Sequence, residues 1–222
     1  MNGYVKRFRS AIEEPRERFG LLLALLVATF VMSGLDTGPV VHFTAGLTNL
    51  LSLLVALTCI GLRRLSVRWL LIVGVGVAGS ALVFASQPEE VVAAVGGSAQ
   101  AVVLAAVAVA VLRRILGHET VTNQTLLGAI SVYFLFGQIF AWVYFALPGF
   151  AGVSVLDPAQ VGEIPMYYSY VVLTTLGFGD ITPVGGLSQR ITVIEALLGQ
   201  LFLAILVARL VAVYSRASTR AG

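Results

Sequence analysis

The sequence predicts an all-α membrane protein with six transmembrane helices. Of its 222 residues, 58% are hydrophobic and 11% are charged, whereas soluble domains use about 25% charged residues. This balance leaves too little polar surface to cover a water-soluble globule. Several apolar stretches also approach the length of about 20 residues that a membrane-crossing helix needs. The six expected helices cover residues 19–34, 43–62, 69–86, 98–116, 124–147 and 189–214.

The segment before the first helix, residues 1–18, has an amphipathic pattern. Apolar residues recur at helical spacing from Tyr4 to Ile12, with basic residues on the other faces, before Pro15 interrupts the pattern. This arrangement favours a short helix on the inner leaflet of the membrane. A disordered basic tail is the alternative.

Basic residues predict the orientation of the chain. In the six-helix scheme, thirteen of the fourteen Lys and Arg residues lie on one side, and only Arg190 lies on the other. The positive-inside rule assigns the basic side to the cytoplasm. We therefore expect a multi-pass protein of the cell membrane with both termini in the cytoplasm. The basic ends, including Arg216 and Arg220, are candidates for contact with anionic lipids.

Cofactor-dependent and catalytic sites are not indicated. Cys59 is the only cysteine, and His42 and His118 lie far apart without acidic or cysteine neighbours at ligand spacing. No paired carboxylates or nucleophile–base set is visible. We expect neither an enzyme nor a protein that uses a cofactor or binds nucleic acid.

The most informative motif, Thr-Thr-Leu-Gly-Phe-Gly-Asp at residues 174–180, lies between the last two apolar stretches. Glycine adopts backbone conformations that other residues avoid. Gly177 and Gly179, separated by Phe178, therefore allow successive carbonyl oxygens to point towards one axis. One chain supplies only one wall around such an axis, so several copies are needed to surround a cation.

This motif and its flanking helices resemble the potassium channel family, in which rings of backbone carbonyls replace the hydration shell of the ion. The resemblance extends from about residue 124 onward. It implies a homotetramer that conducts K+ passively, with a re-entrant pore helix and a selectivity-filter loop between helices 5 and 6. The implied pore domain covers 119–216, with outer helix 124–147, pore helix 165–174, filter 175–180 and inner helix 189–214, followed by a cytoplasmic tail at 217–222.

The resemblance also assigns roles to individual filter residues. The implied K+ ligands are the backbone carbonyls of Thr175, Leu176, Gly177 and Phe178, together with the Thr175 hydroxyl. Gly179 supplies backbone freedom, Asp180 lies at the outer mouth, and Thr174 supports the filter from its inner end.

Two positions depart from the family pattern. Val172 stands where the family commonly has threonine, and Phe178 replaces the more frequent tyrosine. Phe178 lacks a hydroxyl, and a lost hydrogen bond is typically worth about 0.5–1.5 kcal/mol. We therefore expect a filter that inactivates or selects less sharply than one containing tyrosine.

Side chains around the filter are further candidates for its support. Tyr167, Tyr168 and Tyr170 are expected either to form a cuff around the filter or to act as interfacial anchors. Glu195 lies within the inner helix, where an unpaired charge is costly. It is expected either to bond Ser169 or a tyrosine hydroxyl, or to pack as a protonated residue.

Gly199 follows Gly179 at the spacing where inner helices of the family often carry a hinge glycine. Bending at Gly199 during gating is one interpretation, and close helix packing is the other. Glycine weakens a helix by about 1 kcal/mol relative to alanine, which is compatible with either role.

The first four expected helices, within residues 19–118, form a transmembrane domain that lacks voltage-sensor arginines. Residues 98–112 contain no basic residue, whereas gating charge requires basic side chains that move through the membrane field. The alternatives to a potassium channel are a non-selective monovalent cation channel and, less favoured, a transporter or a modulatory channel subunit. A transporter of this kind needs four pore loops in one chain, and this chain has one.

Overall fold

The computed structural model describes residues 19–33, 89–117, 122–151, 155–157 and 165–219. All regular elements in these ranges are helices, and one isolated β-bridge joins Leu156 to Pro183. The expected segment 1–18 and the expected helices 43–62 and 69–86 lie outside the described residues. The count of six membrane helices therefore stays a prediction.

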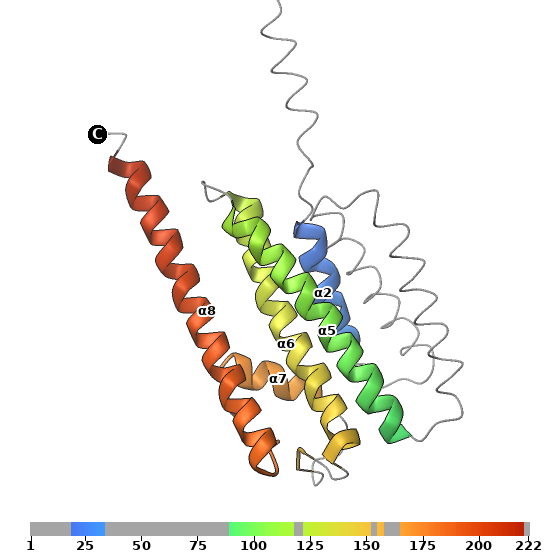
Figure 1. Ribbon diagram of the computed structural model, residues 1–222. Helices are drawn as coiled ribbons and strands as arrows, with labels where there is room; N and C mark the ends of the chain where they lie inside the picture. Colours follow the sequence, from blue (N-terminus) through green and yellow to red (C-terminus); the bar gives the residue numbers. More distant parts are fainter. Residues whose placement is uncertain (1–18, 34–88, 118–121, 152–154, 158–164, 220–222) are drawn as a thin grey trace, which may run out of the picture.

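Four helices run side by side in the described part of the chain (Figure 1). They are α2 (Phe19–Ser33), α5 (Glu89–Leu116), α6 (Asn123–Ala151) and α8 (Gly186–Thr219). Among the described residues, three stretches are long and apolar enough to cross a membrane: Ala94–Leu116, Asn123–Phe150 and Gly186–Arg209. A shorter apolar helix covers Phe19–Met32. The regular structure of the described residues is therefore helical, as predicted, and three of the helices have the length and composition of membrane spans.

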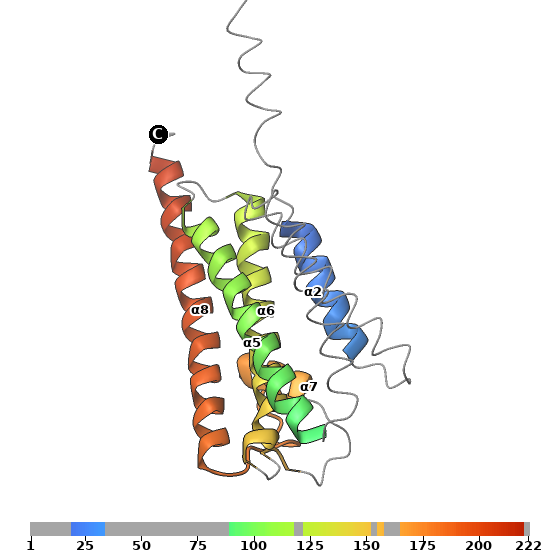
Figure 2. The ribbon, with the colours of Figure 1, turned by 45° about the vertical axis from the view of Figure 1, so that its right-hand side comes forward.

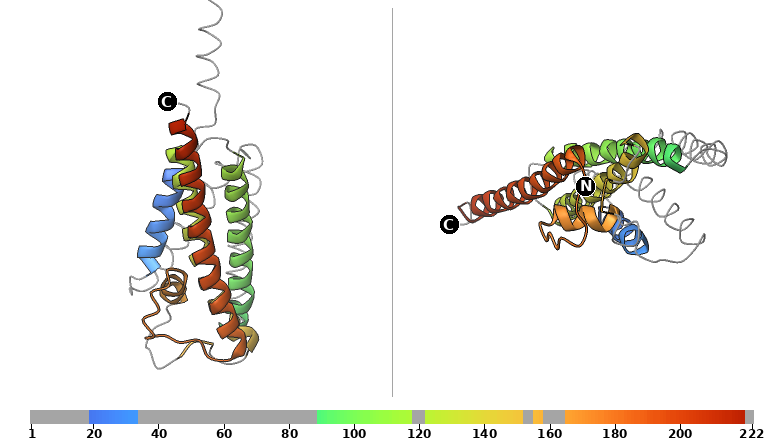
Figure 3. Two further views of the ribbon diagram at one scale, coloured as in Figure 1. Left: turned by 90° about the vertical axis from the view of Figure 1, so that its left-hand side faces the viewer. Right: turned by 90° about the horizontal axis from the view of Figure 1, so that it is seen from below.

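The short helix α7 (Pro165–Leu173) lies in the lower half of the molecule and contacts both α6 and α8 (Figure 2). The view along the helices in Figure 3 places α7 near α2 as well. The C-terminal ends of α5 and α8 lie at the opposite end of the molecule (Figure 1). The segment that follows α7 is therefore separated from the Arg113 and Arg114 side chains, which occupy the last turn of α5.

Several helix bounds differ from the sequence prediction. The helix expected to start at 98 begins at Glu89, so Glu89 and Glu90 belong to α5 and not to a loop. The helix expected at 124–147 continues through Pro148 to Ala151, because proline near a helix end removes only one backbone hydrogen bond.

The last two helices also differ from their predicted limits. Helix α7 ends at Leu173, one residue before the predicted 174, and the residues that follow form a turn. Helix α8 covers Gly186–Thr219 and exceeds the predicted 189–214 at both ends. Hydropathy marks only the part of a helix that lies in lipid, and a helix continues beyond the membrane wherever its backbone hydrogen bonds do.

The apolar core lies where α2, α5 and α6 meet. Its buried residues are Phe19, Leu22, Leu26, Leu104, Val107, Ala108, Val111, Ile115, Val132 and Leu135. Phe202 of α8 packs against the edge of this core, with its ring 5.3 Å from that of Phe136. Helix α6 is thus the central element, because it contacts α2 and α5 as well as α7 and α8.

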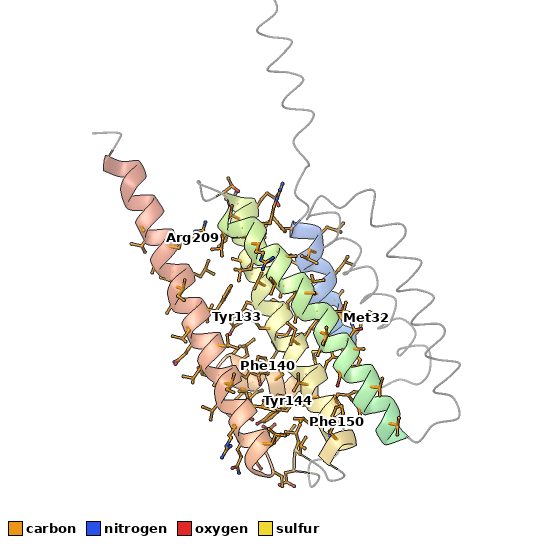
Figure 4. The ribbon with its side chains drawn as sticks, in the orientation of Figure 1. Met32, Tyr133, Phe140, Tyr144, Phe150 and Arg209 are labelled. Carbon is orange, nitrogen blue, oxygen red and sulfur yellow. The ribbon has the colours of Figure 1, made fainter. Side chains whose placement is uncertain are left out.

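At the end away from α7, Arg209 joins α8 to α5. Its guanidinium Nη2 donates a hydrogen bond of 3.2 Å to the backbone carbonyl of Ile115. The last carbonyls of a helix lack intrahelical partners, and a cation also interacts favourably with this end of the helix dipole. Arg209 therefore links α8 to the C-terminal end of α5 (Figure 4).

The contact between α6 and α7 depends on Gly137. A Cβ atom added at Gly137 would lie 2.5 Å from Cζ of Tyr170. We predict that Gly137→Ala lowers the stability of the folded protein by about 1–3 kcal/mol, the usual effect of overpacking. Thermal unfolding in detergent micelles measures the change.

The control for this substitution is Gly96→Ala. A Cβ at Gly96 of α5 meets no atom within 4 Å, so this variant should keep or slightly raise the melting temperature through its higher helix propensity. Equal melting temperatures for the two variants would contradict the close approach of α7 to α6.

Candidate functional site

Helix α7 is fixed to its neighbours through Tyr170. The Tyr170 ring lies 4.6 Å from the ring of Phe30 in α2 and 5.6 Å from that of Phe134 in α6. Its hydroxyl donates a hydrogen bond of 2.7 Å to the Phe134 carbonyl. The buried Tyr170 therefore attaches α7 to two of the long helices.

Tyr168 attaches α7 to α8 instead. Its hydroxyl lies 2.7 Å from the hydroxyl of Thr192, and its ring lies 5.0 Å from that of Tyr144 in α6. The cuff around the filter stays a prediction. The recorded hydrogen bonds of Tyr168 and Tyr170 go to flanking helices and not to the loop that follows α7.

The C-terminal end of α7 is held by α6 and α8 together. The Tyr133 hydroxyl of α6 donates a hydrogen bond of 3.1 Å to the Leu173 carbonyl. On the other side, a Cβ atom at Gly199 would collide with this same carbonyl oxygen. The absence of a side chain at Gly199 thus lets α8 approach α7 closely, which accounts for this glycine by packing. Bending at Gly199 remains a prediction.

Residues 174–180, referred to below as the glycine loop, follow α7 directly. The first residues of this loop bond to the last turn of the helix. The backbone N–H groups of Thr175 and Leu176 each donate a bond of 2.9 Å, to the carbonyls of Val172 and Val171 respectively. The Thr174 hydroxyl donates a bond of 2.6 Å to the Tyr170 carbonyl. The start of the loop is therefore positioned by α7.

Every second residue of the glycine loop from Thr175 to Gly179 has a positive φ angle. Thr175, Gly177 and Gly179 have φ angles of 60°, 56° and 76°, whereas Leu176 and Phe178 do not have positive φ. In an alternation of right- and left-handed residues, successive N–H groups lie on one side of the chain and the carbonyls on the other. The loop thus has the backbone pattern that the sequence indicated for its glycines.

Thr175 was not expected to share this conformation. Positive φ is costly for a β-branched residue, and strained backbone persists only where the surrounding structure imposes it. The hydrogen bond from the Thr175 N–H to Val172 and the close packing at Leu173 supply that constraint.

The side chains of the glycine loop are uncovered in a single protomer. Leu176 and Phe178 are 59% and 65% exposed, and every residue from Thr174 to Asp180 is exposed. The neighbouring surface of α8 is also apolar and open, with Leu187 63% and Ile205 67% exposed. Irregular backbone at membrane depth requires protein or water beside it. One copy of the described chain does not supply this cover.

The outer end of the loop is fixed by Asp180. Its Oδ2 accepts a hydrogen bond of 2.6 Å from the Tyr167 hydroxyl, and its Oδ1 accepts one of 3.1 Å from the N–H of Ile181. The hydrogen bond to Asp180 raises the pKa of Tyr167 above its ordinary value. Among the three tyrosines of α7, Tyr167 is therefore the one whose hydroxyl contacts the loop.

The chain beyond Asp180 returns along residues 155–157. The N–H of Val184 donates a bond of 2.8 Å to the Val155 carbonyl, and the N–H of Asp157 donates one of 3.0 Å to the Thr182 carbonyl. The buried Ser188 hydroxyl donates a bond of 2.8 Å to the same Val155 carbonyl. These contacts connect the start of α8 to the segment that follows α6.

Glu195 is fully buried behind α7. Its Oε1 lies 2.5 Å from the Ser169 hydroxyl, and its Oε2 accepts a bond of 2.9 Å from the Tyr144 hydroxyl. The predicted bond between Glu195 and Ser169 is therefore present. The tyrosine partner comes from α6 and not from α7.

Three contributors to this region were not found from the sequence. Tyr133 and Tyr144 occur in an apolar helix, where tyrosine is normally interpreted as an interfacial anchor. Their separation of three helical turns does place both on one face of α6, and Figure 4 shows them on the side towards α8. Nothing in the sequence indicated that Thr192, one turn before Glu195, would take part in these hydrogen bonds.

The similarity of the chain to known proteins agrees with this geometry. Residues 125–216 match the model of a family described as "Ion channel". No curated protein and no solved structure matches the chain. The matched ion channel region contains nearly all of α6, the whole of α7 and the glycine loop, and α8 as far as Arg216. The match supports an ion channel and points away from an enzyme.

Ion passage should depend on the backbone conformation of the glycine loop. Gly177 has positive φ, and no atom lies within 4 Å of a Cβ added there. We predict that Gly177→Ala abolishes ion flux from reconstituted liposomes, because left-handed backbone costs a residue with a side chain about 1–2 kcal/mol.

A matched control is available at Gly186, at the start of α8. A Cβ at Gly186 also meets no atom within 4 Å, but Gly186 does not have positive φ. Gly186→Ala should therefore conduct like the unmodified chain. Flux that survives equally in both variants would show that the left-handed conformation of Gly177 is not needed.

Proposed function

We propose that the chain forms a homotetrameric potassium channel that conducts K+ passively across the cell membrane, with both termini in the cytoplasm. Each copy contributes the backbone carbonyls of Thr175, Leu176, Gly177 and Phe178, and the hydroxyl of Thr175. Four such loops around one axis replace the hydration shell of the ion. Gly179 and Asp180 complete the loop at its outer end.

The observation that carries this proposal is the alternation of hand along an exposed glycine loop. The loop follows a short helix that is fixed by hydrogen bonds to α6 and to α8. It lies within the part of the chain that matches an ion channel family. The exposed apolar face of α8 and the uncovered loop support association of copies, because a single protomer leaves both open.

The proposed channel does not use an arginine voltage sensor. Within α5, the basic residues are Arg113 and Arg114 in the last turn. That position suits an anchor at the cytoplasmic surface. It does not suit gating charges, which must cross the membrane field.

A non-selective monovalent cation channel is the second candidate, and Phe178 is the observation that favours it. Reversal potentials of the reconstituted protein in opposed K+ and Na+ solutions separate the two. A selective channel reverses near the potassium equilibrium potential, and a non-selective channel reverses near zero. Absence of any flux would leave a modulatory subunit as the interpretation and would overturn the proposal.

The missing hydroxyl at Phe178 predicts a change in selectivity. We expect Phe178→Tyr to raise the permeability of K+ relative to Na+, and to slow the decay of the current. A new hydrogen bond behind the loop contributes about 0.5–1.5 kcal/mol. This free energy corresponds to a change of a few-fold to about tenfold in the ratio of K+ to Na+ permeability. Bi-ionic reversal potentials and current decay after opening measure both effects.

Phe150→Tyr is the control for this prediction. Phe150 is exposed near the end of α6, outside the glycine loop, and its variant should behave like the unmodified channel. Identical selectivity and decay in Phe178→Tyr and the unmodified channel would refute the role assigned to the missing hydroxyl.

A further inference from the structure

The hydroxyl groups around Glu195 form one connected network that is buried except at the partly exposed Thr192. It joins Tyr144 of α6, Tyr168 and Ser169 of α7, and Thr192 and Glu195 of α8. The exposed fractions of Tyr144, Ser169 and Glu195 are 1%, 0% and 0%. Because these groups cannot exchange their hydrogen bonds with water, each proton in the network must have an acceptor within the protein.

Four hydroxyl protons are available, and each has an acceptor. Thr192 bonds its own Ser188 carbonyl at 3.0 Å, and Tyr168 bonds the Thr192 oxygen at 2.7 Å. Tyr144 bonds Glu195 Oε2 at 2.9 Å. For Ser169, the Gly137 carbonyl lies at 2.7 Å and accepts its proton.

Two contacts are then left without a proton of their own. One is the longer contact of 3.2 Å between the Tyr144 and Thr192 hydroxyls, and the other is the short contact between Ser169 and Glu195. The Ser169 oxygen lies 2.5 Å from Glu195 Oε1, but a serine hydroxyl donates only one hydrogen bond. If Ser169 used its proton on Glu195, its contact with the Gly137 carbonyl would join two acceptors in a buried site. A fifth proton, on Glu195 Oε1, satisfies both contacts of Ser169: the one with Glu195 and the one with the Gly137 carbonyl.

The surroundings of Glu195 also oppose a negative charge. Within the described residues, no ion pair involves the Glu195 carboxyl group. The hydrogen-bond partners of this group are neutral hydroxyls. A buried charge without an opposite partner is costly, more so within a membrane-spanning helix.

We propose that Glu195 is a neutral carboxylic acid that donates a hydrogen bond to Ser169 and thereby positions α7 behind the glycine loop. Through Ser169 and Gly137, this bond connects α8, α7 and α6 in series. Glu195 is a positioning residue, because it acts on the loop through α7. The protonation of Glu195 does not depend on the proposed channel function, whereas its effect on the loop rests on that function.

Infrared difference spectroscopy tests the protonation directly, on the full chain in lipid at neutral pH. The spectrum of the unmodified protein minus that of Glu195→Gln should contain the carbonyl band of a protonated carboxylic acid. In Ser169→Ala this band should move to higher wavenumber, because the acid loses its hydrogen-bond acceptor. The matched control is Ser131→Ala, at a buried serine of α6 whose hydroxyl bonds the Leu127 carbonyl at 2.8 Å and the Phe19 carbonyl at 3.5 Å. It should leave the band in place. Carboxylate bands in the difference spectrum, or a band unmoved by Ser169→Ala, would overturn the assignment.

Substitution by glutamine gives the second readout. The glutamine amide can donate to Ser169 and accept from Tyr144, as the neutral acid does, so Glu195→Gln should keep the melting temperature and the ion selectivity. Ser169→Ala should lower the K+ over Na+ permeability ratio by about tenfold, equivalent to about 1.4 kcal/mol, whereas Ser131→Ala should not. Loss of stability or selectivity in Glu195→Gln would contradict the neutral donor. An acid band without potassium selectivity would refute the channel proposal alone.

Discussion

A backbone carbonyl at membrane depth must face protein or water, and this constraint governs the arrangement around the glycine loop. The loop departs from helical geometry directly after Leu173, and its alternating φ angles prevent a regular ladder of hydrogen bonds. Its first residues satisfy their N–H groups on the last turn of α7. The remaining carbonyls therefore need water or further protein beside them.

The short helix α7 is held by hydrogen bonds as well as by packing of its aromatic rings. Lipid is as apolar as leucine, so burial of apolar side chains drives helix association weakly in a membrane, and hydrogen bonds and close packing gain importance. The hydroxyls of Tyr133, Tyr168, Ser169 and Tyr170 all bond groups on another helix. Gly137 and Gly199 remove the side chains that would keep α6 and α8 away. The position of the loop thus follows from contacts that α7 makes on both sides.

The sequence was sufficient for the parts of this arrangement that have local causes. Composition and apolar length predicted the helices, and Gly177 and Gly179 predicted the left-handed backbone. The position of Glu195 within an apolar helix predicted a hydrogen-bond partner for its carboxyl group, because an unpaired charge there is costly. Thr175 could not be predicted to have positive φ, since its local preference opposes it and the constraint comes from packing around α7. The helix ends at Glu89, Ala151 and Thr219 were missed because hydropathy follows lipid exposure, whereas helices follow backbone hydrogen bonding.

The central claim is that carbonyls from several copies of the glycine loop bind alkali cations along a common axis. Crystals grown with rubidium or thallium salts test it most directly, because both ions scatter anomalously and resemble potassium in size. The account predicts a row of anomalous peaks on a fourfold axis, beside the carbonyls of Thr175, Leu176, Gly177 and Phe178. An isolated protomer, or an axis without such peaks beside this loop, would contradict it.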